Sequence, residues 1–373
     1  MSQRIVYKAD CRHFRGDVPC APHKREGVHC ADCSYYDPTD RNILIIKLGA
    51  IGDVIRTTPL LHRLRKEYPG SRIWWLTLTP DVVPSDVDRI LKFDMAGVIS
   101  VLAVNFDLVI NLDKDREACA LADRLEASVK KGFTIRNGIC APVDADAEHK
   151  FLTGLFDDLN KANTRHYVQE IFEICGYEWA GEDYVLEVDT PFDLETTVAS
   201  QGRPPVGERP LVGLNTGCGG RWTTRLWPEE YWIDLSRRLL AAGYQPLFLG
   251  GEQEHEKNTR LARASGGLYL GHFPLKTFIA LMDRCEVIVS AVTMAMHLAI
   301  GLHKPLVLFN NIFNPHEFEL YGRGELLEPS KECTCFFMPT CRNEEYTCME
   351  HLEVERVFAA VQRWVRAEDA STS

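Results

Sequence analysis

The stretch NILIIKLGAIGDVIRTTPLLHRL, residues 42–64, decides the fold of this chain. Its apolar beginning, residues 42–48, has the continuous hydrophobic character of a strand that is buried on both faces. The glycines that follow predict a turn. Thr58 and Pro59 suit the start of a helix, and the leucines after them repeat on one helical face. The stretch therefore predicts a strand, a glycine turn and a helix, which is the repeating element of an α/β fold.

The same alternation continues along the chain. Further strand patterns are RIWWLTLT (72–79), VLAVNFDLVINLD (101–113, with a helix at its start as an alternative), LVGLNTG (211–217), QPLFLGG (245–251), EVIVSAV (286–292) and PLVLFNN (305–311). Strands separated by helical patterns predict parallel sheets. The proline- and glycine-rich residues 200–210 predict a linker. We therefore expect two Rossmann-like domains that face one another across a cleft.

Four parts of the chain follow from this pattern. They are a Cys-rich, metal-stapled segment (1–41), an N-terminal Rossmann-like domain (42–200), a C-terminal Rossmann-like domain (201–350) that includes a Cys-rich loop (331–349), and a C-terminal helix and tail (351–373). The first segment is too small and too polar to fold on a hydrophobic core alone.

Composition excludes several classes of protein. The 373 residues carry a formal net charge of −11, and 45% of them are hydrophobic. An acidic chain without a basic patch argues against a nucleic-acid partner. No apolar run reaches the roughly 18 residues that a membrane span needs, and the first residues lack the apolar core of a signal peptide. We expect a cytoplasmic protein, either free or at the cytoplasmic face of the inner membrane, with at most peripheral membrane contact.

Asp53 follows the first strand, where a helix begins. A carboxylate there commonly accepts hydrogen bonds from backbone N–H groups, so one interpretation is structural. The other is a general base in a cleft, because ligands of such sheets bind beyond the carboxyl ends of the strands. The residues leave both interpretations open. Further candidates for substrate contact are Gly52, Lys47, Arg56 and, at the end of a strand, Asp113. Lys47 and Arg56 would position an acidic acceptor, with surface solvation as the alternative.

The second half carries features of phosphate binding. The segment NTGCGGRWTTRLWPEEYW (215–232) follows a strand, and its small residues would let backbone amides approach an anion that arginines neutralise. The segment SAVTMAMHLA (290–299) places a threonine and a histidine at a helix start, which suits a diphosphate. Each candidate also has a structural interpretation. The segment 215–232 could be a solvated basic loop, Glu252 a carboxylate at a helix start, and His297 a buried, hydrogen-bonded histidine. The substrate-binding candidates in this half are Thr216, Arg221, Arg225, Glu252, Thr293, Met294, His297, Asn311 and Glu317.

Four segments together resemble a known family. IIKLGAIGDVIRTTPLL (45–61), RLWPEEYW (225–232), GGEQEHE (250–256) and TMAMHLAIGLHKPLVLFNN (293–311) resemble the ADP-heptose:lipopolysaccharide heptosyltransferases, over about residues 42–365. The resemblance implies a GT-B fold, with the acceptor in the N-terminal domain and a nucleotide-diphosphate sugar in the C-terminal domain. It implies inverting transfer of heptose from ADP-heptose to a hydroxyl of a lipopolysaccharide-type saccharide, with no metal needed for the transfer.

The resemblance also implies roles for single residues. Asp53 matches the family's general base, which takes the proton of the acceptor hydroxyl. Arg225 matches a lysine that stabilises the charge on the leaving diphosphate. Glu252 matches a carboxylate that binds the nucleotide ribose.

One motif departs from the family pattern. Relatives carry Asp-Thr-Gly where this chain has Val292-Thr293-Met294, so a carboxylate and a glycine near the phosphates are lost. The donor contacts would then be rebuilt by residues such as Asn311 or Glu317, or the chain would be a non-catalytic nucleotide- and metal-binding relative. An epimerase acting on nucleotide sugars would share the fold but not the Trp-Pro-Glu-Glu context.

Eight of the thirteen cysteines form two groups: Cys11, Cys20, Cys30 and Cys33, and Cys333, Cys335, Cys341 and Cys348. In a reducing cytosol such groups indicate metal rather than disulfides. Four thiolates suit structural zinc, iron or an iron–sulfur cluster. We expect two structural sites, with one shared site and reduced, unligated thiols as the alternatives. Some protein-directed relatives of the family resemble this chain in carrying a C-terminal four-cysteine iron finger, so the alternative to a saccharide acceptor is a protein acceptor.

Overall fold

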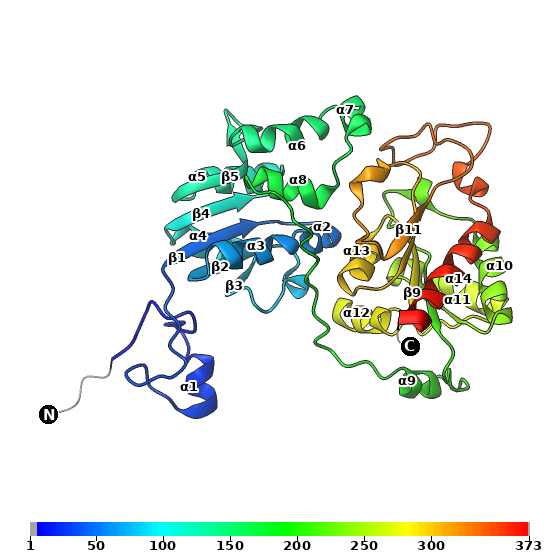
Figure 1. The fold of residues 1–373 in the computed structure, drawn as a ribbon, viewed down its shortest axis with the longest axis horizontal. Coiled ribbons are helices and arrows are strands. Elements are labelled where there is room, and N and C mark those ends of the chain that lie inside the picture. Colours follow the sequence, from blue (N-terminus) through cyan, green and yellow to red (C-terminus); the bar gives the residue numbers. More distant parts are fainter. Residues whose placement is uncertain (1–5, 372–373) are drawn as a thin grey trace. The chain divides into compact units, whose positions relative to one another are not determined.

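The structure is a computed structural model that describes residues 6–371, with side chains described through residue 365. The chain forms two compact units (Figure 1). The first comprises residues 1–49, 59–151 and 171–178, and the second comprises 50–58, 152–170 and 179–373. The structural division therefore differs from a single boundary at residue 200, because the chain passes from one unit to the other several times.

The first unit is built on a six-stranded sheet with the order β3-β2-β1-β4-β5-β6, in which only β5 and β6 pair antiparallel. Its strands are β1 (Arg41–Ile46), β2 (Ser71–Thr77), β3 (Arg89–Lys92), β4 (Phe106–Asn111), β5 (Ala127–Arg136) and β6 (Ile139–Pro142). Its helices are α1 (Ala21–Glu26), α3 (Pro59–Glu67), α4 (Met95–Leu102) and α5 (Arg116–Arg124), while α6 (Glu148–Thr153) and α8 (Tyr167–Ile174) lie partly in each unit. Residues 43–46 of β1 are at most 1% exposed. This burial explains the continuous apolar run at the start of the deciding stretch.

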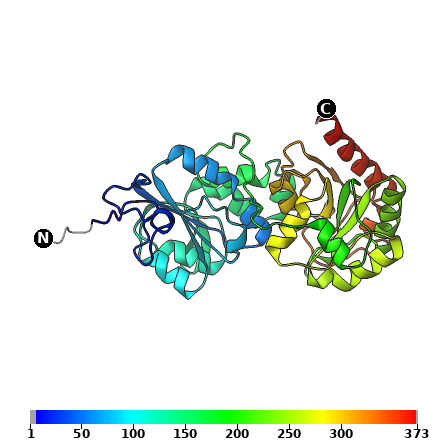
Figure 2. The same ribbon diagram turned by 90° about the horizontal axis from the view of Figure 1, so that it is seen from below.

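The second unit is built on a five-stranded sheet with the order β11-β10-β9-β7-β8, and all its pairs are parallel. Its strands are β7 (Leu211–Asn215), β8 (Gln245–Leu249), β9 (Val287–Ala291), β10 (Leu306–Phe309) and β11 (Gly324–Leu327). Its helices are α2 (Ile51–Ile55), α7 (Asp157–Ala162), α9 (Leu194–Ser200), α10 (Glu229–Ala241), α11 (His255–Ser265), α12 (Leu275–Asp283), α13 (Met294–Gly301) and α14 (Val354–Ser371). The apolar faces of α10, α11 and α14 share one core with the strands, and α13 packs against β9 and β10. Figure 2 shows helices of the second unit, coloured green to red, around its sheet.

Two features of this arrangement position the candidate site. The strand order of the second sheet reverses between β7 and β9, and such a switch point is where open α/β sheets bind ligands. The residues after β1 form the short helix α2 instead of the predicted glycine turn, so Asp53 stands on a helix. The predicted α/β class, with two parallel-sheet domains, is confirmed. In the stretch from residue 6 to 371, no helix combines the length and the apolar character that crossing a membrane requires.

Candidate active site

A cleft of about 830 Å³ opens in the second unit, at the carboxyl ends of β7, β8 and β9. This volume is within the range of ordinary small-molecule sites. Loops after the three strands line the cleft, and α2 lines it as well. The predicted site residues that line it are Gly52, Asp53, Arg56, Arg225, Glu252, Thr293, Met294, His297 and Glu317. Residues from distant parts of the sequence thus meet in one place.

The switch point forms the floor of the cleft. Thr293 caps α13, because its hydroxyl accepts a hydrogen bond from the Ala295 N–H at 3.2 Å. Asn215, the last residue of β7, donates from its amide to the hydroxyls of Ser290 (3.0 Å) and Thr293 (3.3 Å). These bonds fix the start of an eight-residue helix whose N-terminal end faces the cleft. A helix N-terminus attracts anions through its unpaired N–H groups and its dipole.

Asp53 serves two partners within the protein. One carboxylate oxygen accepts a hydrogen bond from the Ala50 N–H at 3.1 Å, as the structural interpretation expects. The other lies 2.7 Å from the Arg56 guanidinium. The side chain still lines the cleft and is 31% exposed. Helix capping and a position suited to a general base therefore coexist, and the role of base stays a prediction.

Arg56 is held inside the protein rather than facing solvent. Its guanidinium contacts the carboxylates of Asp53 and of Glu317 (3.0 Å), and it stacks on the ring of Tyr167 at 3.3 Å from the centroid. Burial alone would lower the pKa of Arg56, but the two carboxylates outweigh it and raise the pKa. The charge of Arg56 is thus neutralised by the protein's own carboxylates. This geometry gives no support to a contact between Arg56 and an acidic acceptor.

His297 is buried under α2. A Cβ atom on Gly52 would lie 2.3 Å from His297 Cδ2, so only glycine allows α2 to approach this closely. The Tyr184 hydroxyl lies 3.3 Å from His297 Nδ1, and the two rings are stacked. Burial, together with the nearby Arg56 charge, lowers the pKa of His297 to about 3. The imidazole is therefore neutral at physiological pH and would contact a diphosphate without contributing positive charge.

Arg225 is the buried cation of the cleft. Its side chain donates to the Cys218 carbonyl at 2.9 Å and lies over the ring of Phe313. Among the side chains of residues 6–365, no carboxylate forms an ion pair with it. Burial without a counter-charge lowers the pKa of Arg225 to about 10. A buried guanidinium that lacks a carboxylate partner is suited to bind an anionic ligand.

The loop after β8 contributes a second carboxylate that the sequence did not single out. Glu252 is exposed on the rim of the cleft, open to a ribose. Glu254 folds back, accepts a hydrogen bond from the Gly251 N–H at 3.0 Å, and fills the space beside Gly217 and Gly250. A Cβ atom on Gly217, in the loop after β7, would lie 2.5 Å from Glu254, which explains the glycine at this position.

The sequence reasoning also missed an aromatic wall. Trp222, Phe313 and Phe337 line the cleft, with ring centroids 5.1–5.7 Å apart. Such faces stack on planar or sugar rings of a ligand. The three residues come from separate loops without periodicity. The only signal in the sequence was the presence of large aromatics in loop segments rich in glycine (Trp222), asparagine (Phe313) or cysteine (Phe337).

Lys47 and Asp113 do not line the cleft. They form an ion pair of 2.5 Å in the first unit, where they are 3% and 5% exposed, and Asp113 also accepts a hydrogen bond from the Leu48 N–H. Burial raises the pKa of Asp113, and the charge of Lys47 opposes this. The two charges satisfy one another. The proposed contacts of these two residues with an acceptor therefore have no support in this geometry.

Three further candidates lie outside the cleft lining. Buried Thr216 donates to the side chain of Asn258 at 2.5 Å. Exposed Arg221 lies against the ring of Trp222. Asn311 donates to the carbonyl of Thr224 at 2.8 Å and to the sulfur of Cys348 at 3.2 Å. Asn311 thus joins the segment that carries Arg225 to the C-terminal cysteines.

The C-terminal cysteines gather around that connection. The sulfur atoms of Cys335 and Cys341 lie 3.8 Å apart, and the neighbouring thiol of Cys348 raises the pKa of Cys333. The Arg342 N–H donates to Cys335 at 3.2 Å. No three histidine, cysteine or carboxylate side chains in the described residues form a ready-made metal site. Zinc or iron at these cysteines therefore stays a prediction.

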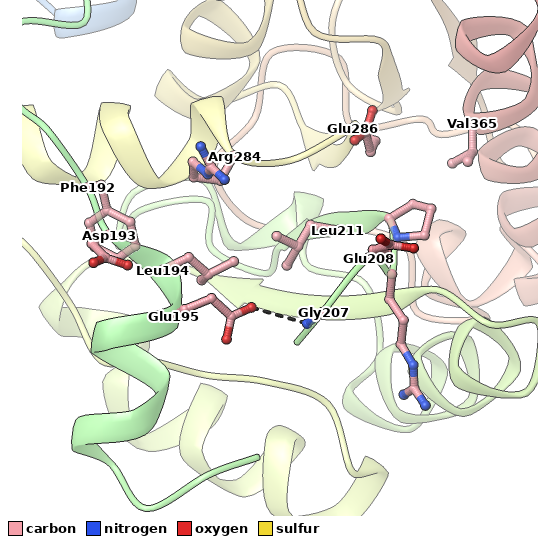
Figure 3. Close-up of a pocket in the computed structure, with 12 residues that line it drawn as sticks. Phe192, Asp193, Leu194, Glu195, Gly207, Glu208, Leu211, Arg284, Glu286 and Val365 are labelled. Carbon is pink, nitrogen blue, oxygen red and sulfur yellow. Dashed lines mark hydrogen bonds between the residues drawn. The ribbon is translucent and has the colours of Figure 1, made fainter. Parts of the chain in front are cut away.

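A second cavity, of about 680 Å³, lies at the opposite end of the strands in the second sheet (Figure 3). Leu211 begins β7 and Glu286 precedes β9, so this cavity is at the amino ends of the strands. Its rim is charged, and Glu195 already accepts hydrogen bonds from backbone N–H groups, including that of Gly207. This end of a parallel sheet is not where such folds bind their substrates.

Two units, one built on a mainly parallel sheet and one on a fully parallel sheet, each with its own helices, form the architecture of a GT-B glycosyltransferase. Residues 98–346 match the model of glycosyltransferase family 9 (heptosyltransferase), so the chain belongs to this family and is a glycosyltransferase. The lipopolysaccharide heptosyltransferase 1 of Pseudomonas aeruginosa is 26% identical over 88% of this chain and 99% of its own length.

Solved structures share the fold. A family 9 glycosyltransferase from Veillonella parvula has a TM-score of 0.67 and 19% identity, with 88% of this chain and 98% of that chain covered. The Escherichia coli heptosyltransferase WaaC with ADP has a TM-score of 0.57 and 18% identity, with 89% and 100% covered. The iron-containing heptosyltransferase TibC in complex with ADP-D-β-D-heptose has a TM-score of 0.54 and 11% identity, with 88% and 77% covered.

Proposed function

We propose that this chain transfers heptose from ADP-heptose to a hydroxyl of a lipopolysaccharide-type saccharide, with inversion at the anomeric carbon. Two findings support this substrate pair. The chain belongs to the heptosyltransferase family, and it is similar to a lipopolysaccharide heptosyltransferase over almost the whole length of that relative. Structures of the same fold hold ADP or ADP-heptose.

One observation carries the proposal. Arg225 is a buried cation without a carboxylate partner in the described residues, and it lines the same cleft as the N-terminal end of α13. These two sources of positive potential suit the diphosphate of the donor. Asp53 lines that cleft too, so a base and an anion site occur together.

The reaction then proceeds by a single displacement. Asp53 accepts the proton of the acceptor hydroxyl, whose oxygen forms a bond to the anomeric carbon. The bond between that carbon and the phosphate oxygen breaks, and its electron pair leaves with ADP. Arg225 and the N–H groups at the start of α13 stabilise the charge that develops on the diphosphate. The step needs no metal.

A coupled assay of ADP release from ADP-heptose, with a lipopolysaccharide core acceptor, tests this function. Asp53→Asn keeps the cap of α2 but lacks the basic oxygen, so we expect unchanged ADP affinity by calorimetry and about 10²–10⁴-fold lower kcat. Turnover within a few-fold of the unsubstituted enzyme would remove Asp53 as the base. Absence of ADP binding together with absence of ADP-heptose hydrolysis would favour a non-catalytic protein.

The C-terminal cysteines favour a second acceptor class. We propose that Cys333, Cys335, Cys341 and Cys348 hold iron or zinc, by analogy with the iron-containing heptosyltransferase TibC. Their mutual contacts, and N–H groups that donate to two of the sulfurs, fit a thiolate site. Because this four-cysteine group resembles the C-terminal finger of some protein-directed relatives of the family, the assay includes a serine-rich protein acceptor. Transfer to protein alone would replace the saccharide proposal.

A further inference from the structure

The segment of residues 6–40 is folded almost without a hydrophobic core. Within it only Cys11 and Pro22 are buried, and its one helix, α1, has six residues. Ordering a backbone costs about 1–2 kcal/mol per residue, so a segment with so little burial needs another source of stability. Its cysteines are all free, so disulfides do not supply that stability.

Its four cysteines line one small cavity. Cys11, Cys20, Cys30 and Cys33 surround a space of about 20 Å³, together with aromatic rings that include Tyr35. A space of this size has room for about one water molecule or one ion. The cavity lies in the first unit and takes no part in the cleft described above.

The backbone around the cysteines forms tight turns. The Phe14 N–H donates to the Cys11 carbonyl at 3.0 Å, and the Tyr36 N–H donates to the Cys33 carbonyl at 3.3 Å. Cys20 precedes the first residue of α1. Turns at Cys11 and Cys33 and the helix start at Cys20 thus lie around the same cavity, which Cys30 also lines. No three candidate ligands in the described part of the chain already meet as a closed set, so the thiols need side-chain rotations to close on an ion.

We propose that Cys11, Cys20, Cys30 and Cys33 bind one zinc ion as a tetrahedral tetrathiolate. Zinc suits the site because four thiolates and a closed, redox-inert coordination are typical of structural zinc. Binding one ion replaces the missing core, since the free energy of metal binding becomes free energy of folding.

The site also fastens the segment to the first sheet. Arg12, next to the ligand Cys11, donates to the Ser71 carbonyl at 2.6 Å and pairs with Asp88 at 3.0 Å. Arg72 of β2 donates to the Cys11 carbonyl at 2.8 Å. Figure 1 shows the segment beside the end of the sheet where β1 begins. Loss of zinc therefore loosens both the segment and this attachment.

Metal content of the full-length chain tests the proposal, independently of any transfer activity. We expect Cys30→Ser/Cys33→Ser to lose one equivalent of zinc relative to the unsubstituted chain. Cys335→Ser/Cys341→Ser retains that equivalent, and Cys140→Ser, outside both groups, leaves the metal content unchanged. Unaltered zinc in Cys30→Ser/Cys33→Ser would overturn the proposal, and iron that depends on these cysteines would overturn zinc as the ion.

Two further readouts cover misfolding. Cobalt exchanged into Cys335→Ser/Cys341→Ser is expected to give the visible and charge-transfer bands of a tetrahedral tetrathiolate, and these bands vanish when Cys30 and Cys33 are also replaced. In Cys30→Ser/Cys33→Ser, backbone hydrogen exchange is expected to become faster in residues 6–40 and to stay unchanged in the sheet of the second unit. Uniformly faster exchange with unaltered cobalt bands would refute the site.

Discussion

Replacing Arg225 by methionine separates the stability of this protein from its function. The guanidinium is 7% exposed and has no carboxylate partner in the described chain, so the folded protein bears the cost of its desolvation. Burial lowers its pKa from 12.5 to about 10. At about 1.4 kcal/mol per pH unit, this difference corresponds to about 3 kcal/mol. Methionine fills a similar space without charge.

The substitution also removes a favourable contact. The bond from Arg225 to the Cys218 carbonyl is worth about 1 kcal/mol net. We therefore expect the free energy of unfolding of Arg225→Met to rise by about 2 kcal/mol. Loss of charge-assisted bonds to the diphosphate costs about 1.5–3 kcal/mol, which weakens ADP binding by about 10–150-fold.

Urea denaturation and calorimetry with ADP measure the two effects separately. Arg221→Met is the matched control, because Arg221 lies in the same loop but is exposed and does not line the cleft. We expect it to change stability by less than about 0.5 kcal/mol and ADP affinity only slightly. ADP affinity retained in Arg225→Met, or a marked loss of stability, would refute the assignment of Arg225 as the anion contact.

Three further predictions concern the surroundings of the cleft. Gly52→Ala places a methyl group 2.3 Å from the buried His297 ring, so we expect a loss of about 1–3 kcal/mol in urea denaturation, with reduced ADP release. The pKa of His297 is about 3 in the folded protein, against 6.5 for an ordinary histidine. As the pH falls, the unfolded chain therefore takes up a proton at this residue before the folded protein does. The free energy of unfolding therefore decreases as the pH falls from 6.5 towards 3, by up to about 1.4 kcal/mol per pH unit, and this loss is absent above pH 6.5. We expect His297→Gln to lack this pH dependence in urea denaturation. Asn311→Ala loosens the segment that carries Arg225, and we expect a several-fold weaker ADP affinity by calorimetry.

Controls for these predictions lie elsewhere on the chain. Gly251→Ala meets only Glu254 at 3.6 Å, an ordinary contact, and should fold normally. His62→Gln alters an exposed histidine and should keep the pH dependence. Asn105→Ala removes an exposed amide and should leave ADP affinity unchanged. Equal effects of a variant and its control would refute the corresponding argument.

The sequence predicted the parts of the site that follow strands. Arg225, Glu252 and Thr293 each follow a buried strand of the second sheet, and the parallel topology brings such positions to the same end of that sheet. Asp53 follows β1 of the first sheet and lines the same cleft through α2. Lys47 also follows a strand, but it pairs with Asp113, 66 residues away, and charge pairing leaves no local pattern in a sequence.

Other parts of the site depend on tertiary contacts alone. The aromatic wall of Trp222, Phe313 and Phe337 comes from three loops, in which no hydrophobic period indicates a shared surface. Arg56 stacks on the ring of Tyr167, although the two residues are more than a hundred positions apart in the sequence. The neutral state of His297 results from burial under α2, which the sequence did not show to be a helix.

The position of α2 has a consequence for catalysis. Its residues follow β1 in the chain, yet they belong to the second compact unit, where Gly52 packs on His297 and Ile55 lies near Gly301 of α13. Arg56 adds an ion pair to Glu317 of the same unit. The distance between Asp53 and the N-terminal end of α13 is therefore set within one unit. If Asp53 is the base, the alignment of base and diphosphate is built in before any acceptor arrives, which is the preorganisation that favours charge development at the leaving group.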